Sequence, residues 1–442
     1  MRTLFALGVL LLACGFQAVA QNPVVTAEED IYTIVSPNNG SGPLWSFGCT
    51  PILRLGNRVF VAQMETGEGV PKLCNTRWRL LERTDAGWQM LAEAEGYRQR
   101  EPTLLATAAP NTAYLYVNDS MRPPGTEYGP CEPHLLRFDV TKAAPIAPAK
   151  ISPVWPGTPT FTDHSYRSYA ADPANSHLLM VNIDAKTSDL NWSFLTAEGE
   201  TLKNGLITFP IRSCYAQTAL IGNTAHVLAV GDIVEPVKEW QAYKFEQTKQ
   251  KWDYVFRILY LTQNPDLLTS GFAPPIEIAN VDATAGHITN HDLWIAPNGD
   301  AYILYSETEV NGALMRDKFF PGKSILPALK LAIVRGGQVL ERKTLVEAAE
   351  SKVAGYARFH VAHDGSVYVF SYITGAEGGN FLEHLYPPVE NPVERVRVAF
   401  EKPFTSFLLA NTRAGNAPSN TIDVYGNRND GSVISYGRIE LK

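Results

Sequence analysis

Short runs of alternating apolar and polar residues recur along the chain, each after a tight turn. Successive side chains of a strand point to opposite faces of a sheet, so this alternation predicts strands. Asn298-Gly299 precedes AYILYSE, and Asp364-Gly365 precedes SVYVFSY. Such turns between alternating runs are typical of β-hairpins. Five further turns of this kind lie at Gly56-Asn57, Pro110-Asn111, Pro173-Ala174-Asn175, Gly222-Asn223 and Asp430-Gly431.

Seven similar hairpins, spaced along the whole chain, predict an all-β protein folded as a single seven-bladed β-propeller over residues 21–442. The last hairpin ends almost at the C-terminus, so its blade lacks an outer strand. We expect Ile31 to Val35 (IYTIV) to supply that strand and close the ring, because closure removes two unpaired sheet edges. The alternative architecture is a pair of stacked β-sandwiches.

The first twenty residues have the pattern of a signal peptide. Arg2 precedes an apolar run from Leu4 to Leu12, and Ala18-Val19-Ala20 forms a small-residue cleavage site. We therefore expect export to a secreted or periplasmic location. The alternative is a lipoprotein at the cell envelope, anchored through Cys14. No later stretch reaches eighteen unbroken apolar residues, so no transmembrane segment is predicted.

Charge and cysteine content narrow the classes of partner. The chain has 38 Lys and Arg against 45 Asp and Glu, with no basic cluster, which argues against a nucleic-acid partner. The cysteines Cys49, Cys74, Cys131 and Cys214 include no C-x-x-C pair, which argues against a zinc knuckle. Cys49–Cys74 is the first disulfide to test among three pairings. We expect a monomer without a cofactor or a bound metal, a structural Ca²⁺ being the open alternative.

In a propeller, the residues just before each inner strand surround one mouth of the central channel. If each turn joins the two inner strands of its blade, the mouth residues are Phe47-Gly48-Cys49, Arg100-Glu101, His164 to Arg167, Arg212 to Tyr215, His287 to Asp292, Arg358-Phe359-His360 and Arg413 to Asn420. We expect His164, Arg167, Tyr215, His291 and Arg358 to converge on one cavity. The alternative for each histidine is an ordinary core or turn position.

A long aromatic insertion follows Asp232. Trp240, Tyr243, Trp252 and Tyr254 all lie within it. Such rings stack on the apolar faces of sugars, so we expect them to bind substrate. The alternative is that they pack the insertion against blade four.

The blade openings followed by hairpin turns resemble the sialidase-like (BNR-repeat) propeller superfamily of exported bacterial proteins, from about Trp45 to Lys442. That resemblance implies an arginine triad holding a carboxylate, with Arg100, Arg167 and Arg358 as its members. However, sialidases have six blades, and only Thr84 to Trp88 comes close to their Asp-box turn. Seven blades with mouth histidines are more similar to propeller polysaccharide lyases, in which Arg or His neutralises a uronate carboxylate while His or Tyr removes the C5 proton.

We therefore expect a carbohydrate-active protein that acts on an oligo- or polysaccharide, with β-elimination as its reaction. Fixed positive charge makes the C5 proton acidic enough for a nearby base to remove. In this hypothesis Arg358 or Arg167 neutralises the carboxylate, His291 is the base and Tyr215 or His287 is its partner. Arg100 and His164 join the four aromatic residues in substrate binding.

Two other functions stay open. A sialidase-like exo-glycosidase needs two carboxylates across a pocket. Its candidates are Glu101, Asp163, Asp232, Asp292 and Glu307. A non-catalytic glycan-binding propeller needs only the aromatic and arginine side chains.

Overall fold

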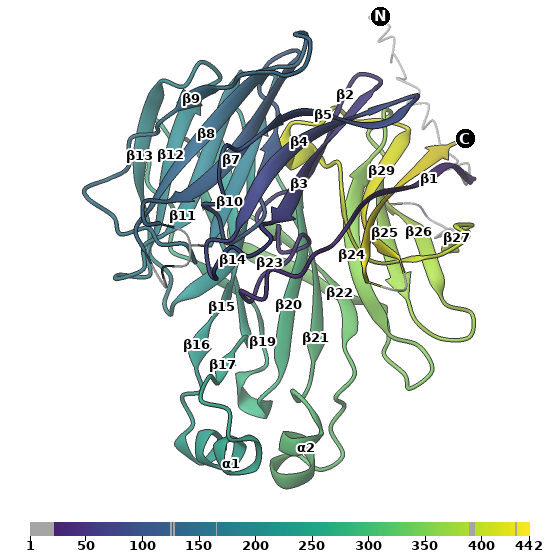
Figure 1. Ribbon diagram of the computed structural model, residues 1–442. Helices are drawn as coiled ribbons and strands as arrows, with labels where there is room; N and C mark the ends of the chain where they lie inside the picture. The colour runs from purple at the N-terminus through teal and green to yellow at the C-terminus, as the bar shows by residue number, and fades with distance from the viewer. Residues whose placement is uncertain (1–21, 124–125, 127–128, 165, 389–393, 429–430) are drawn as a thin grey trace, which may run out of the picture.

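The computed structural model describes residues 22–442 apart from 124–125, 127–128, 165, 389–393 and 429–430. Within these residues, seven four-stranded antiparallel sheets form the blades of a propeller (Figure 1). The predicted seven-bladed, all-β fold is confirmed. The predicted signal peptide, with Cys14, lies outside the described residues, and so does Asp430 of the seventh predicted turn.

Each blade is built outward from an inner strand that faces the channel. Blade 1 contains β2 (Ile52–Leu55), β3 (Arg58–Thr66), β4 (Thr76–Thr84) and β5 (Gly87–Glu93). Blade 2 contains β6 (Leu104–Ala106), β7 (Thr112–Ser120), β8 (Cys131–Asp139) and β9 (Ala149–Ile151). Blade 3 contains β10 (Arg167–Asp172), β11 (His177–Ile183), β12 (Leu190–Thr196) and β13 (Thr201–Ile207).

The remaining blades follow the same plan. Blade 4 contains β14 (Ser213–Ile221), β15 (Thr224–Gly231), β18 (Ile258–Asn264) and β19 (Ile276–Asn280). Blade 5 contains β20 (His287–Ile295), β21 (Ala301–Thr308), β22 (Ala328–Arg335) and β23 (Gln338–Val346). Blade 6 contains β24 (Ala354–Val361), β25 (Val367–Ile373), β26 (Gly379–Tyr386) and β27 (Val396–Val398). Blade 7 contains β28 (Phe404–Leu409), β29 (Thr421–Arg428), β30 (Val433–Leu441) and, as its outer strand, β1 (Pro23–Thr33).

The N-terminal strand closes the ring, as predicted. β1 runs antiparallel to β30, from Pro23 opposite Leu441 to Thr33 opposite Val433. The closing strand begins eight residues earlier than the predicted Ile31 and ends at Thr33. Two register breaks, between Val25 and Ala27 and between Asp30 and Tyr32, interrupt its alternation. Because the apolar period is broken twice, only the last part of the strand is visible in the sequence.

The core lies between neighbouring blades, not at the centre of the disc. Leu179 and Phe194 of blade 3 pack against Val227 and Tyr260 of blade 4, and all four are at most 2% exposed. Because each blade lies between two others, its middle strands are buried on both faces. This explains why six of the seven residues of both β11 and β12 are buried.

Blade 7 corrects one sequence-based assignment. Its inner pair is β28 and β29, joined by residues 410–420 and the short helix η2 (Thr412–Ala414). The predicted turn at Gly431 joins the second and third strands instead. Arg413 to Asn420 therefore follow the inner strand, and their expected place at the mouth is wrong. A Cβ at Gly415 would collide with the carbonyl oxygen of Thr107, which follows β6, so this loop packs at the opposite end of the channel.

Two insertions project from the mouth face. In blade 4, β16 (Ile233–Val234) and β17 (Tyr254–Val255) support α1 (Lys238–Thr248). In blade 5, α2 (Ala313–Phe319) lies beside α1 (Figure 1). No helix in the described part of the chain has the length and apolarity that a membrane-spanning helix needs.

The four cysteines of the described chain are buried free thiols. Cys49 packs in a core cluster with Leu104 and Tyr169, and its sulfur lies 3.5 Å from the carbonyl oxygen of Leu105. Cys74 lies beside Ser120 instead. The expected Cys49–Cys74 disulfide is therefore not formed, because the two thiols belong to different surroundings.

Candidate functional site

A chain of hydrogen-bonded side chains crosses the mouth above blades 2, 3 and 4. Glu101 precedes β6, His164 and Tyr166 precede β10, and Tyr215 lies on β14. His164 Nδ1 lies 2.8 Å from Glu101 Oε1, and His164 Nε2 lies 3.1 Å from the Tyr166 hydroxyl. The Tyr166 and Tyr215 hydroxyls are 3.4 Å apart. With Nδ1–H donating to the carboxylate, Nε2 is left to accept the proton of Tyr166.

Tyr215 reaches this chain through a distortion of its strand. Its φ angle is +52°, and the pairing of β14 with β15 is interrupted between Cys214 and Gln217. The Asn290 amide donates to the Tyr215 carbonyl oxygen at 2.8 Å, and Gln217 Nε2 donates to the His291 carbonyl oxygen at 2.8 Å. A bulky residue at positive φ is uncommon, and bulges of this kind re-aim side chains at functional sites.

Arg167 supplies a buried positive charge beside the two tyrosines. Its side chain donates to the carbonyl oxygens of Pro102 at 2.7 Å and Glu101 at 3.4 Å. Among the described residues, no carboxylate lies within 4 Å of its guanidinium, because the Glu101 carboxylate turns to His164 instead. Arg167 is 7% exposed, so a positive charge that lacks a counter-ion is fixed at the mouth.

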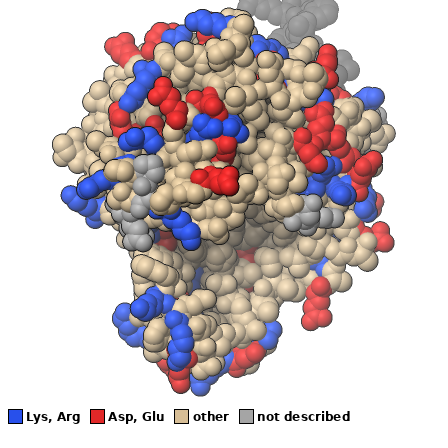
Figure 2. All heavy atoms as spheres, in the orientation of Figure 1, with Lys and Arg blue, Asp and Glu red and all other residues tan. Residues whose placement is uncertain are grey.

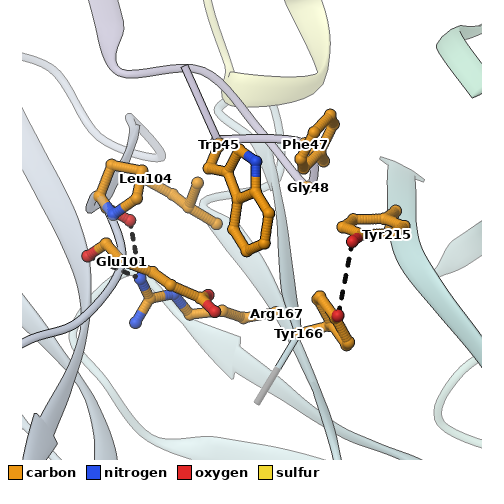
Figure 3. A pocket seen from close by; sticks show the side chains of 9 residues that line it. Trp45, Phe47, Gly48, Glu101, Leu104, Tyr166, Arg167 and Tyr215 are labelled. Atoms are coloured by element: carbon orange, nitrogen blue, oxygen red, sulfur yellow. Dashed lines mark hydrogen bonds between the residues drawn. The ribbon is translucent and has the colours of Figure 1, made fainter. Parts of the chain in front are cut away.

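Glu101, Tyr166, Arg167 and Tyr215 line one pocket, and His164 lies just behind its lining. Figure 3 shows Arg167 below the ring of Trp45, with Tyr166 and Tyr215 side by side to the right of that ring and their hydroxyls directed toward each other. The pocket is narrow and partly open to solvent. It is lined by Trp45, Phe47, Gly48, Glu101, Pro102, Leu104, Tyr166, Arg167 and Tyr215. Its lining combines aromatic rings with hydroxyl and guanidinium groups, which is the usual composition of a small-ligand site.

A second arginine lies at the rim. Arg212 forms an ion pair with the Asp232 carboxylate and donates to the Asp232 carbonyl oxygen at 3.0 Å. Its guanidinium carbon lies 5.6 Å from the ring centre of Tyr166 and 5.7 Å from that of Tyr254. Arg212 therefore connects the site to the insertion of blade 4.

A neighbouring pocket extends the site toward blade 5. It shares Phe47 and Tyr215 with the first pocket and is the wider of the two. Its other lining residues include Phe256, His287 and Asn290. His287 Nε2 lies 3.2 Å from Thr289 Oγ1, and burial, with a contribution from nearby Arg257, lowers the pKa of His287. This imidazole is neutral at neutral pH.

Burial keeps both tyrosines protonated. It raises the pKa of Tyr215 to about 12 and moves the pKa of Tyr166 well above its usual range. At neutral pH both hydroxyls therefore carry a proton. Tyr166 becomes basic only as its own proton moves to His164.

His291 and Arg358 lie deeper in the channel, and neither lines the two mouth pockets. His291 is 3% exposed, its Nε2 lies 2.6 Å from Ser306 Oγ, and burial lowers its pKa to about 3. Arg358 donates to the Ala357 carbonyl oxygen at 2.8 Å and lies over the ring of Tyr356. The structure thus brings His164, Arg167 and Tyr215 together at the mouth and places His291 and Arg358 below it.

A buried ion pair lies close to these deep residues. Arg413 reaches across the channel to Asp292 Oδ1 at 2.8 Å and donates to the carbonyl oxygens of Gly48 and Thr218. The backbone amide of Phe359 donates to Asp292 Oδ2 at 2.9 Å. The Asp292 carboxylate is therefore fully occupied by internal partners.

The three arginines expected to form a sialidase-like triad have three different surroundings. Arg100 donates to the Asn39 carbonyl oxygen, and its Nη1 lies 3.8 Å from the Asp163 carboxylate. Arg167 lines the mouth pocket, and Arg358 is in the channel. Of the three, only Arg167 lines either of the two mouth pockets.

The carboxylates considered for a glycosidase each have a basic partner. The pairs are Glu101 with His164, Asp163 with Arg100 at 3.8 Å, Asp232 with Arg212, Asp292 with Arg413 and Glu307 with Lys330. Only Glu101 lines the pocket of Figure 3. The described part of the chain therefore places no second of these carboxylates opposite it, as a glycosidase mechanism requires.

The four aromatic residues of the insertion divide into two pairs. Trp240 and Tyr243, on α1, pack against Phe319 and Phe320 beside α2, so they hold the two insertions together. Trp252 and Tyr254 are exposed to solvent. The first pair does pack, but against the insertion of blade 5 and not against blade 4 as the alternative had it, and the second pair is not packed.

Sequence reasoning gave no role to several residues of the site. Tyr166 and Arg212 lay inside predicted mouth segments but received no function, and Trp45 lay just before one. Glu101 was considered only as a glycosidase carboxylate. All four precede the inner strand of a blade. A residue's place shortly before an inner strand is therefore the feature of the sequence that indicates them. Among the described residues, no three or more His, Cys, Asp and Glu side chains form a group able to hold a metal ion.

No protein-family model and no curated protein matches the sequence. Solved structures are similar in fold. The polysaccharide lyase Uly1 superposes with a TM-score of 0.55 at 10% identity, covering 96% of this chain and 99% of that chain. A PL25 ulvan lyase bound to -[GlcA(1-4)Rha3S]- superposes with a TM-score of 0.58 at 10% identity, covering 94% of each chain. At this identity the comparison shows that the chain shares the propeller fold of these lyases.

Proposed function

We propose that the chain is a polysaccharide lyase that cleaves uronate-containing glycans by β-elimination. The observation that carries this proposal is the hydrogen-bonded series Glu101–His164–Tyr166–Tyr215 beside the unpaired Arg167. The shared fold with two polysaccharide lyases, one of them bound to a glucuronate-containing oligosaccharide, supports the same reaction class.

Arg167 is the group that neutralises the uronate carboxylate. The C5 proton is removed only when the charge that develops on the adjacent carboxylate is stabilised. Arg167 is suited to this because its guanidinium is buried, held by two carbonyl oxygens and free of a competing carboxylate among the described residues. A substrate carboxylate would provide the counter-ion that Arg167 lacks.

Tyr166 and His164 together remove the C5 proton. As the Tyr166 oxygen takes the proton from carbon, its own proton passes to His164 Nε2, and the Glu101 carboxylate stabilises the imidazolium. The electrons of the C5–H bond form the C4–C5 double bond as the C4–O bond breaks. The Tyr215 hydroxyl then protonates the leaving oxygen. Coupled transfer lets Tyr166 act despite its raised pKa.

The roles of base and of carboxylate-neutralising residue differ from those expected from the sequence. Tyr166 with His164 replaces His291 as the base, and Arg167 takes the role shared with Arg358. Tyr215 keeps its role as the partner acid. His287, in the neighbouring pocket, contacts the next sugar. A substrate of this class lies outside the cytoplasm, in keeping with the export that residues 1–20 predict.

The experiment is a panel of uronate polysaccharides, with ultraviolet absorbance recording the unsaturated product. We expect the wild-type protein to cleave at least one, and Tyr166→Phe to lower the rate about 100- to 1000-fold while binding persists, because a proton-transfer group acts mainly in the transition state. Tyr372→Phe in blade 6, which lines neither mouth pocket, is the matched control.

Other outcomes contradict the proposal in distinct ways. Cleavage without an unsaturated product would establish a glycosidase. Binding without cleavage would establish a glycan-binding propeller. A normal rate in Tyr166→Phe would remove the hydrogen-bonded series from the reaction.

A further inference from the structure

Two insertions form a projection beside the mouth, consisting of residues 233–255 and 309–326. Its base is rigid. Glu235, 1% exposed, forms ion pairs with Arg257 at 2.5 Å and Lys244 at 2.8 Å, and Lys244 also reaches Asp253 at 2.6 Å. The β16–β17 ladder holds the two ends of the blade 4 insertion together. Side chains on this projection are therefore presented in fixed positions.

The projection exposes two aromatic rings in a nearly parallel arrangement. Trp252 is 77% exposed and Tyr254 is 43% exposed, with ring centres 6.5 Å apart and planes inclined by 20°. Neither ring is needed to join α1 to α2, because Trp240 and Tyr243 do that. Flat, exposed aromatic faces on a rigid support are suited to stacking on the apolar faces of sugars.

The projection is also basic, whereas the whole chain is acidic. Residues 233–255 and 309–326 contain seven lysines and arginines and six acidic residues, a net charge of +1, against −7 for the whole chain. Within the described residues, Lys238, Lys249, Lys251 and Lys318 have no carboxylate within ion-pair distance. Figure 2 shows lysine and arginine atoms gathered on the projecting lobe at the lower end of the molecule. This surface attracts a negatively charged polymer.

The exposed rings are continuous with the pocket. Tyr254 stacks with Trp252 on one side and contacts the Arg212 guanidinium at 5.7 Å on the other, and Arg212 contacts Tyr166 at 5.6 Å. Three contacts separate the ring of Trp252 from the ring of Tyr166. This path is longer than one sugar ring, so a bound chain that follows it extends beyond the sugar at the reacting bond.

We propose that the projection, through Trp252, Tyr254 and the unpaired lysines Lys249 and Lys251 that follow α1, binds a second stretch of an acidic glycan chain at a distance from the bond that is cleaved. This inference rests on the proposed function for the identity of the polymer. It assigns to the projection a preference for long, negatively charged chains, which the pocket alone does not provide.

Polymer binding is measured on the Tyr166→Phe background, with polyglucuronate, polygalacturonate and alginate as probes and dextran as the neutral control. We expect Trp252→Ala to weaken binding of the retained polyuronate by roughly tenfold through lost stacking, while binding of the corresponding trisaccharide is unchanged. Lys249→Ser with Lys251→Ser weakens polymer binding and reduces its dependence on salt. Lys142→Ser with Lys203→Ser, on blades 2 and 3, removes the same charge from other surfaces.

Each other outcome overturns this inference or the proposed function separately. Unchanged polymer binding in both projection variants overturns the inference and leaves the lyase proposal standing. An equal loss for polymer and trisaccharide places Trp252 within the pocket site and also overturns it. A wild-type protein that retains polyuronates through Trp252 but cleaves none sustains the inference and ends the lyase proposal. Retention of none of the three polyuronates overturns the inference.

Discussion

The mouth above blades 2 to 4 and the channel between blades 5 and 7 contain similar residues in different states. In the mouth, the hydrogen bonds of Glu101, His164 and Tyr166 run toward an open pocket, and Arg167 lacks a counter-ion among the described residues. In the channel, Asp292 and Arg413 neutralise each other, and His291 is hydrogen-bonded to Ser306. The mouth residues can still bind a ligand through the charge of Arg167 and the groups that face the pocket. The channel residues already bind one another.

Depth along the inner strand produces this difference. His164 and Tyr166 precede the first residue of β10, whereas His291 and Arg358 are each the fifth residue of their strands. A strand rises about 3.3 Å per residue, so side chains further along an inner strand lie deeper in the channel. In β20 the first four residues, up to Asn290, line the neighbouring pocket, and His291 is the first that does not. Tyr215 is the third residue of β14, yet its bulge returns it to the pocket.

Removing one histidine from each region tests this difference most directly. We expect His164→Ala to lower the rate of unsaturated product formation by about 10²- to 10⁴-fold, the usual range for a group that accepts a proton in catalysis. His291→Gln should retain activity, because His291 lines neither mouth pocket. Initial rates measured by ultraviolet absorbance test both. The reverse result would put the base back in the channel.

The channel cluster is expected to matter for stability. Arg413→Met leaves the Asp292 carboxylate buried without its ion-pair partner, which typically costs about 3–5 kcal/mol. Urea unfolding measures the loss. Arg335→Met provides a comparison, because Arg335 makes a similar two-bonded pair with Asp300 but its side chain is 61% exposed, so the loss should be smaller. Equal losses for the two variants would contradict the distinction between the buried and the exposed pair.

The smallest expected effect concerns pH. Burial lowers the pKa of His291 to about 3 from its ordinary value of 6.5. A lowered folded-state pKa gives stability that is present above about pH 6.5 and is lost as the pH falls toward 3. Between pH 7 and pH 5 this loss is on the order of 2 kcal/mol. Thermal unfolding across this range should show a shallower decline in His291→Gln, although His226 and His360, both with pKa values lowered to about 4, still contribute. An identical decline would contradict the burial of His291.

The blade count was readable from sequence because hairpin turns and alternation are local. Ring closure was readable because the last blade lacked an outer strand and an unassigned apolar segment preceded the first blade. The position of the last turn within its blade was not readable. The turn at Gly431 resembles the others in sequence, but it joins the second and third strands of its blade, whereas the others join the first and second. The mouth segments contained His164, Tyr166 and Arg167, so the region of the site was predictable. Which histidine reaches the pocket was not, because depth within an inner strand and the bulge at Tyr215 depend on pairing between strands.

The pairing of β1 with β30 also sets an order of events in folding. β1 pairs with a strand that the ribosome makes about 400 residues later, and Asn22 donates to the carbonyl oxygen of Lys442 at 3.0 Å. β1 therefore has no partner until β30 has been made. Contacts of such long sequence separation form slowly. Until then the nascent propeller is an open arc with two free edges, and the last strand to arrive converts it into a ring.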